Sequence, residues 1–313
     1  MSNKTSREST QEKKDFERFP LSSIIGENHL IHAAIASLIF IIVWTPYRFL
    51  TSILISKGIS IRVVDSLVKP AVKSGIVLFC LRFLDKIPRN QYLRELGMKR
   101  ENLFKGLALG LLAWFLYTIT LQYVKLCLSA DGLLLPSLRI MAWEPSKYFL
   151  DMAYFVFIIG LFEEMFTRGY ILKELFNGIT GKFRLLIALL FSGALFSLFH
   201  FPIDIFVMKY ALDQLLLHSL FTLSFSVLAG VLFVRSGWQI VGVVVLHGLM
   251  DAKPLFYLAH PEARFDLVGK ELLIAYLVSF SAPLLAIELI HKVRKKVVIG
   301  ISSVRGLSSQ DGF

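Results

Sequence analysis

The chain carries ionisable side chains at helical spacing inside apolar segments. Glu164 and Arg168 follow the apolar run 154–162, and Glu163 precedes them. Residues four apart share one face of a helix, so Glu164 and Arg168 can pair, whereas Glu163 projects about 100° away. A charge at the centre of a bilayer costs about 2.5–3.5 kcal/mol, which makes a functional role the default. We predict that Glu164 neutralises Arg168 and that Glu163 stays unpaired, as suits a general base acting on water.

Two further pairs have the same four-residue spacing. Phe196 and His200 form one, and His247 and Asp251 form the other. An imidazole can accept a proton from water or donate a hydrogen bond to an oxyanion. Taken singly, such residues are explained as well by structural ion pairs or interhelical hydrogen bonds. Together they predict one shared site.

The elements that position these residues must cross a membrane. Hydrophobic residues make up 55% of the 313 positions, and mean hydropathy is +0.64. The apolar runs are continuous and close to the roughly 20 residues that span a bilayer, whereas a β-barrel would alternate with a period of two. We therefore predict an all-α polytopic membrane helix bundle with about eight transmembrane helices. The expected spans are 29–49, 68–85, 103–124, 148–170, 183–201, 211–234, 238–258 and 271–290.

Two of these spans fit the pattern less well because they contain charges. The segment 238–258 is interrupted by Asp251, Lys253 and Pro254. The segment 68–85 carries three basic side chains, Lys69, Lys73 and Arg82.

The domain organisation follows from the polar ends of the chain. Residues 1–28 and 291–313 are expected to be cytoplasmic tails around a single transmembrane domain at 29–290. The net charge of +11 is explained by topology, since most of the 34 lysine and arginine residues fall on one side if both termini are inside. We expect an integral protein of the plasma membrane that contacts membrane lipids and no nucleic acid.

The three motifs, Glu-Glu-x-x-x-Arg, Phe-x-x-x-His and His-x-x-x-Asp, occur in this order at 163–168, 196–200 and 247–251. In order and spacing they resemble those of the CAAX-protease and bacteriocin-processing membrane endopeptidases, called the CPBP or Abi family. The resemblance covers about 103–290 and implies an eight-helix, metal-independent intramembrane glutamate protease without a cofactor. Its expected substrate is a membrane-associated or lipidated peptide or protein.

The resemblance also implies a role for each motif residue. Prenyl-endopeptidase members have Asn where this chain has Asp251, and an ionised carboxylate cannot donate to an oxyanion. Asp251 must then be protonated, or it must hold His247 as an imidazolium that donates alone. The implied catalytic residues are Glu163 and His200 for activating water, His247 and Asp251 for the oxyanion hole, and Glu164 and Arg168 for orienting the base, with Phe196 contacting substrate.

Two other functions are compatible with the same residues. In a non-catalytic membrane scaffold or bacteriocin self-immunity protein, they would form a buried structural network. In a zinc hydrolase, Glu, His and Asp would be ligands. The zinc alternative is disfavoured because the chain lacks the compact His-Glu-x-x-His spacing on one helix.

Overall fold

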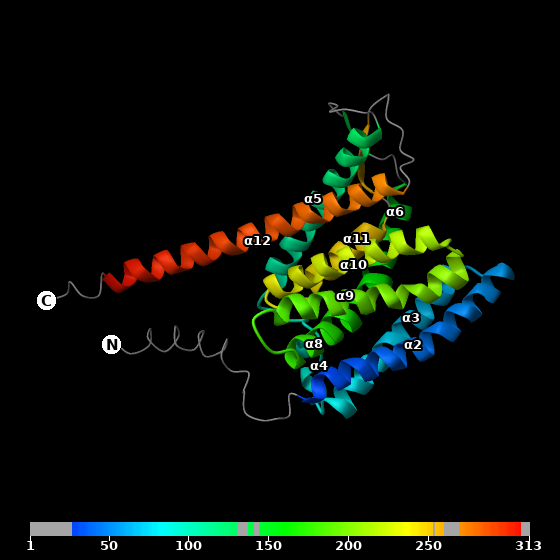
Figure 1. Cartoon of the computed structure of the whole chain (residues 1–313), viewed down its shortest axis with the longest axis horizontal. Coiled ribbons are helices and arrows are strands. Elements are labelled where there is room, and N and C mark those ends of the chain that lie inside the picture. The colour runs from blue at the N-terminus through cyan, green and yellow to red at the C-terminus, as the bar shows by residue number, and fades with distance from the viewer. Residues whose placement is uncertain (1–26, 130–136, 141–143, 253, 260–268, 308–313) are drawn as a thin grey trace.

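The computed structural model describes residues 27–129, 137–140, 144–252, 254–259 and 269–307, and α-helices dominate it (Figure 1). The predicted all-α bundle is confirmed. The helices that carry none of the three motifs are α2 (Glu27–Ser56), α3 (Ile61–Phe79) with its π-helical extension η2 (Cys80–Leu84), the short η3 (Arg89–Gln91) and α4 (Tyr92–Glu95), α5 (Leu103–Ser129), α10 (Leu212–Arg235) and α12 (Lys270–Leu307).

The helices that carry the three motifs lie between α5 and α12 in the chain. One continuous helical stretch contains the Glu-Glu motif and alternates between α-helical and π-helical turns. This stretch comprises α6 (Pro145–Ala153), η4 (Tyr154–Gly160), α7 (Leu161–Glu164), η5 (Met165–Leu172) and α8 (Lys173–Gly178). The second motif is on α9 (Arg184–Ile203), which η6 (Asp204–Met208) extends, and the third is on α11 (Val241–Asp251).

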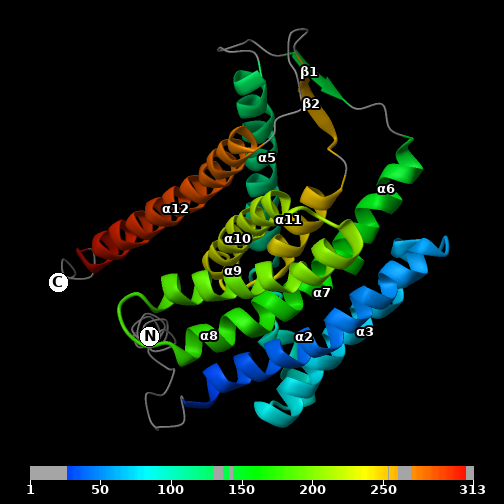
Figure 2. The same ribbon diagram turned by 45° about the vertical axis from the view of Figure 1, so that its right-hand side comes forward.

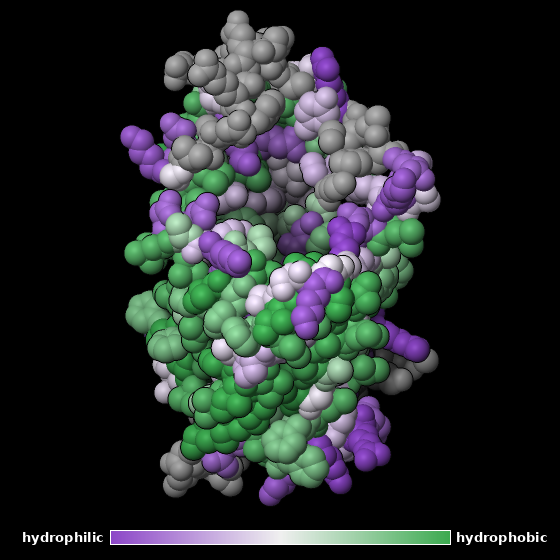
Figure 3. Space-filling view, turned by 90° about the vertical axis from the view of Figure 1, so that its right-hand side faces the viewer, coloured by the Kyte–Doolittle hydropathy of each residue, from purple (hydrophilic) through white to green (hydrophobic). Residues whose placement is uncertain are grey.

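Five helices in the described part of the chain are long and apolar enough to cross a membrane. The predicted number of eight spans is therefore not confirmed. Large apolar side chains such as Leu67, Leu150 and Leu285 are exposed, and Figure 3 shows a broad hydrophobic band bordered above and below by hydrophilic side chains. Both features indicate an integral membrane protein, because lipid contacts such a surface favourably. The qualifying segments are 28–56, 103–129, 184–208, 212–235 and 270–294.

The prediction of a span over 238–258 is wrong. Helix α11 has 11 residues and ends at Asp251. At 1.5 Å per residue it is about 16 Å long, short of the roughly 30 Å hydrocarbon core. Pro254 follows closely and cannot continue a helix, and the chain then enters a strand. Asp251 consequently lies at a helix end.

That strand is β2 (Phe256–Ala259), which pairs antiparallel with β1 (Ser137–Ile140) (Figure 2). The side chain of Gln122 on α5 binds the backbone of β2. Gln122 Nε2 donates to the Phe256 carbonyl, and Gln122 Oε1 accepts from the Leu258 backbone N–H. The segment that follows the His-x-x-x-Asp motif is thus tied to α5.

Close backbone contact between α5 and α11 positions the third motif. A Cβ on Gly242 would lie 2.0 Å from the carbonyl oxygen of Gly106, and one on Gly110 would lie 2.2 Å from the carbonyl oxygen of Gly242. On the other side of α11, a Cβ on Gly248 would lie 2.5 Å from the Cα of Val156 in η4. Only glycine permits this spacing, so α11 is held between the two elements.

An aromatic core joins α2 to the motif helices. The Phe40 ring lies 4.9 Å from that of Phe166 and 4.7 Å from that of Phe199, measured between centroids. All three rings are buried. Helix α2 is thus packed directly against η5 and α9.

The predicted tails lie partly outside the described residues. Of 1–28, only Glu27 and Asn28 are described, and they begin α2. Within 291–313, α12 continues to Leu307 and extends away from the bundle (Figures 1 and 2). Residues 308–313 lie outside the described part.

Candidate active site

The Glu-Glu motif occupies a short α-helical turn between two π-helical segments. Glu163 and Glu164 end α7, with η4 before them and η5 after them. π-helical turns inside helices occur frequently at functional sites, because they change the direction in which successive side chains point. Both carboxylates are buried, at 4% and 0% residue exposure. Buried charges at this level require partners.

Glu164 connects the first motif to the third. Its Oε1 accepts from Arg168 Nη1 at 2.9 Å, as the four-residue spacing predicted, and from His247 Nδ1 at 2.6 Å. The Arg168 guanidinium also lies 4.5 Å from the Phe196 ring centroid and 5.2 Å from that of Phe225. The arginine is therefore held by a charge and by two aromatic faces.

The prediction that Glu163 is unpaired is wrong. Its Oε1 lies 2.8 Å from Lys73 Nζ and 3.2 Å from Lys69 Nζ, and both lysines are buried on α3. Lys69 Nζ also lies 3.6 Å from Asp65, which in turn pairs with Arg48 of α2. In the sequence, these lysines are evident only as charges that interrupt an expected apolar span.

The second oxygen of Glu163 faces two imidazoles. Its Oε2 lies 3.8 Å from His200 Nε2 and 3.8 Å from His247 Nε2. These separations are too long for direct hydrogen bonds and suit a bridging water molecule. The three predicted residues from α7, α9 and α11 therefore converge on one point.

The hydrogen bonds of the two histidines identify Nδ1 as a donor in each ring. His200 Nδ1 lies 2.8 Å from the Phe196 carbonyl, which can only accept, so Nδ1 carries hydrogen and Nε2 has a free lone pair. His247 Nδ1 donates to Glu164, and its Nε2 lies 3.4 Å from Asp251 Oδ2. His200 is thus arranged to accept a proton, and His247 lies among three carboxylates.

A cavity of about 240 Å³ opens beside these groups. Its lining includes Glu163, Phe196, His200, His247 and Asp251. Asp251 is the most accessible of them, with 36% of its side chain exposed. The arrangement can hold a water molecule and a polar substrate group next to a carboxylate and two imidazoles.

A family model described as "Type II CAAX prenyl endopeptidase Rce1-like" matches residues 145–252. The match begins at α6, ends one residue beyond Asp251 and includes all three motifs. The matched segment, residues 145–252, is thus similar to the CPBP family. The match supports a protease, and it is shorter than the predicted range of 103–290.

No curated protein and no solved structure matched the chain.

Glu163 of the matched segment is bound by side chains that lie outside the matched residues. Lys69 and Lys73, which bind Glu163, belong to α3 and precede residue 145. Asp65, Lys69 and Lys73 recur at four-residue intervals and so lie on one face of α3, which is the signal in the sequence that could have identified them. The charged face of α3 completes the site.

Phe196, for which a substrate contact was predicted, lies within the matched segment and is only 2% exposed. The centroid of its ring lies 4.6 Å from that of the His200 ring, and the Arg168 guanidinium lies over its face. The structure thus places Phe196 beneath the polar groups, where it supports them. A contact with substrate stays a prediction.

Arg168→Met provides a test of this buried network. The change removes a fully buried charge and leaves Glu164 with His247 alone, so we expect the free energy of unfolding to fall by about 3–5 kcal/mol. Thermal and denaturant unfolding of the detergent-solubilised protein measure it. Arg62→Met is the matched control, since Arg62 pairs with Asp151 but is 52% exposed, and it should cost less than about 1 kcal/mol. Equal losses in both variants would contradict the assigned network.

Proposed function

We propose that the protein is an intramembrane glutamic endopeptidase that hydrolyses a peptide bond in a membrane-associated or lipidated peptide or protein. The observation that carries the proposal is the convergence of Glu163 Oε2, His200 Nε2 and His247 Nε2 at 3.8 Å separations beside a cavity. The CPBP match supports a protease of this kind. We place the protein in the plasma membrane with both termini cytoplasmic.

In this mechanism a water molecule lies between Glu163 and His200. Lys69 and Lys73 stabilise the ionised carboxylate of Glu163, which reduces its own tendency to take the proton. His200 Nε2 therefore accepts the proton as water attacks the peptide carbonyl, and Glu163 stabilises the resulting imidazolium. The same proton is then delivered to the leaving amine.

His247 supplies the oxyanion contact. Glu164 and Asp251 lie on either side of its ring and favour an imidazolium, which donates from Nε2. This assignment explains how Asp can replace the Asn of prenyl-endopeptidase members, because Asp251 then acts through His247 and need not donate. Arg168 balances the charge of Glu164. No metal ion or cofactor is required in this scheme.

The ion pairs of Glu163 favour a second candidate, a non-catalytic membrane scaffold or self-immunity protein. A carboxylate bound to two buried lysines is also what a purely structural network would contain. The two functions differ in what Glu163→Gln does, since the amide keeps the shape of the side chain and cannot act as the ionised carboxylate.

Glu163→Gln and His200→Ala should each abolish cleavage while leaving a folded protein. The direct measurement compares membrane peptides, by mass spectrometry, from cells carrying the wild type and each variant, and substrate should accumulate in the variants. Asp213→Asn on α10, a carboxylate outside this network, is the control and should behave as wild type. Full processing by either site variant would refute the protease, and a phenotype that survives Glu163→Gln but fails in Arg168→Met would favour the scaffold.

Lys73→Met should lower kcat/KM by about tenfold, equivalent to about 1.4 kcal/mol, because Glu163 then keeps only the longer contact to Lys69. The rate of cleavage of an identified substrate measures the effect, with unfolding followed in parallel. Lys125→Met, at a half-buried lysine of α5, is the control. Unchanged kcat/KM in Lys73→Met would show that the lysine does not support the reaction.

A further inference from the structure

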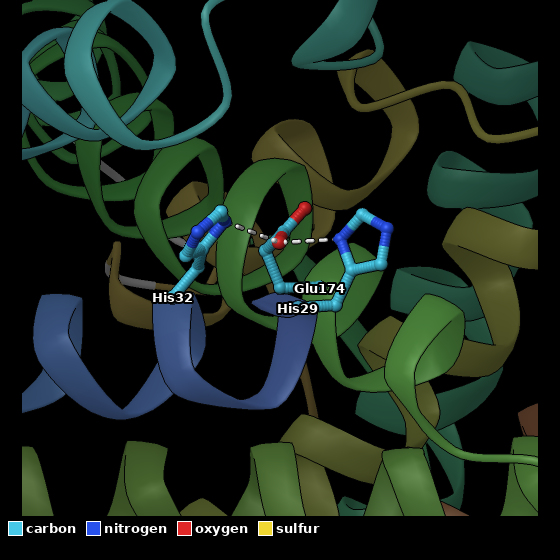
Figure 4. Close-up of side chains that lie close together, drawn as sticks. All are labelled: His29, His32 and Glu174. Carbon is cyan, nitrogen blue, oxygen red and sulfur yellow. Dashed lines mark hydrogen bonds and ion pairs between the residues drawn. The ribbon is translucent and has the colours of Figure 1, made fainter. Parts of the chain in front are cut away.

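A second cluster of histidine and carboxylate side chains lies away from the proposed active site. His29 and His32, one helical turn apart, project from the start of α2 towards Glu174 of α8 (Figure 4). One donor atom from each of the three residues lies within 4.8 Å of the other two. Asp85, directly after η2, joins them through His32. The cluster therefore combines three segments that are distant in the chain.

The contacts within the cluster centre on one carboxylate oxygen. Glu174 Oε2 lies 2.8 Å from His29 Nδ1 and 3.7 Å from His32 Nδ1, with the two rings on opposite sides of it (Figure 4). Asp85 Oδ1 lies 2.6 Å from the same Nδ1 of His32. Two imidazoles and the Glu174 carboxylate thus direct their donor atoms into one small volume, which Asp85 approaches through His32.

The charges of the cluster are not balanced by lysine or arginine. In the described part of the chain, histidines are the only basic groups within 4.0 Å of Asp85 or Glu174, whose side chains are each 10% exposed. Lys173 lies nearby but pairs with Glu95. Buried carboxylates without a lysine or arginine partner are groups whose burial a bound divalent cation would offset.

Two buried polar atoms lie beside the cluster. Asp85 Oδ2 and the hydroxyl of Tyr170 are buried, and the Tyr170 side chain interacts with those of Asp85 and Cys80. Tyr170 is only 2% exposed. Both residues line a cavity of about 350 Å³ that also contains His29, His32 and Glu174, which leaves room for an ion and its water molecules.

We propose that His29, His32, Glu174 and Asp85 form a binding site for a divalent transition-metal ion, with zinc the best fit. Two nitrogen and two oxygen donors satisfy the tetrahedral coordination that zinc prefers. Donors about 2.0–2.2 Å from such an ion are about 3.3–3.6 Å apart. Side-chain rotation therefore has to separate the two hydrogen-bonded pairs and bring the more distant donors closer. His29, at 37% side-chain exposure, has the room to rotate.

The ion would join α2 and the end of the α3 extension to the helical stretch that carries the Glu-Glu motif. His29 and His32 are on α2, Asp85 follows the extension of α3, and Glu174 continues the helix of Glu163. The metal would therefore stabilise the packing of α3 against the motif helix. This site is separate from the proposed catalytic residues, and binding is measured without any substrate.

The test uses full-length protein, purified in detergent without a polyhistidine tag and stripped of metal, with Co²⁺ as the spectroscopic probe and Zn²⁺ as competitor. We expect one Co²⁺ per chain, visible absorption typical of tetrahedral coordination, loss of that absorption on adding Zn²⁺, and a higher melting temperature with Zn²⁺. His32→Asn and Glu174→Gln should weaken Co²⁺ binding at least 100-fold and abolish the thermal shift.

Two control variants distinguish Co²⁺ binding at this site from Co²⁺ binding by other carboxylates of the chain. Glu95→Gln changes a carboxylate that lines the same cavity but pairs with Lys173, and it should bind Co²⁺ as the wild type does. Glu163→Gln reports on the catalytic cluster and should also leave binding intact. Absence of tetrahedral Co²⁺ in the wild type would overturn the proposal, as would binding that persists in both His32→Asn and Glu174→Gln or is lost in Glu163→Gln.

Discussion

The buried carboxylate of Glu163 sets the arrangement of the helices around it. One of its oxygens binds Lys69 and Lys73 from α3, and the other faces His200 of α9 and His247 of α11. Removing such charges from water costs several kcal/mol per ion, and only good geometry offsets the cost. A displacement of any of these helices would leave a charge uncompensated. Stability and function thus depend on the same contacts.

The neighbouring carboxylate has a different role because its surroundings differ. Glu164 is fully buried, binds Arg168 and His247, and has no lysine contact among the described residues. It fixes the imidazole of His247 and leaves the second nitrogen directed at Glu163 and Asp251. The π-helical turns on both sides of α7 allow adjacent glutamates to serve separate partners.

The sequence was sufficient to predict the helical membrane fold and the residues that converge. Spacing identified the Glu164 and Arg168 pair, and the joint occurrence of three motifs predicted that His200 and His247 would approach Glu163. Spacing describes one helix at a time, however, and does not specify which helix packs against another. For that reason the lysine face of α3 was interpreted as an imperfect span.

The remaining differences between prediction and structure have local causes. Helix α11 stops at Asp251 because Pro254 and the following strand replace the last turns of the expected span. The close contact of α11 with α5 depends on which glycines meet across the two helices, at Gly106, Gly110 and Gly242. His29 and His32 gave no signal beyond a spacing of three, since Asp85 and Glu174 reach them only in the folded chain.

The most direct measurement of the central claim is hydrolysis by the purified protein in lipid vesicles. A membrane peptide that accumulates in cells carrying Glu163→Gln is supplied in water enriched in ¹⁸O, and its products are analysed by mass spectrometry. The account predicts cleavage at one bond by the wild type, ¹⁸O in the new carboxyl terminus, and no cleavage by Glu163→Gln. An intact peptide with the wild type, or equal cleavage by both proteins, would contradict it.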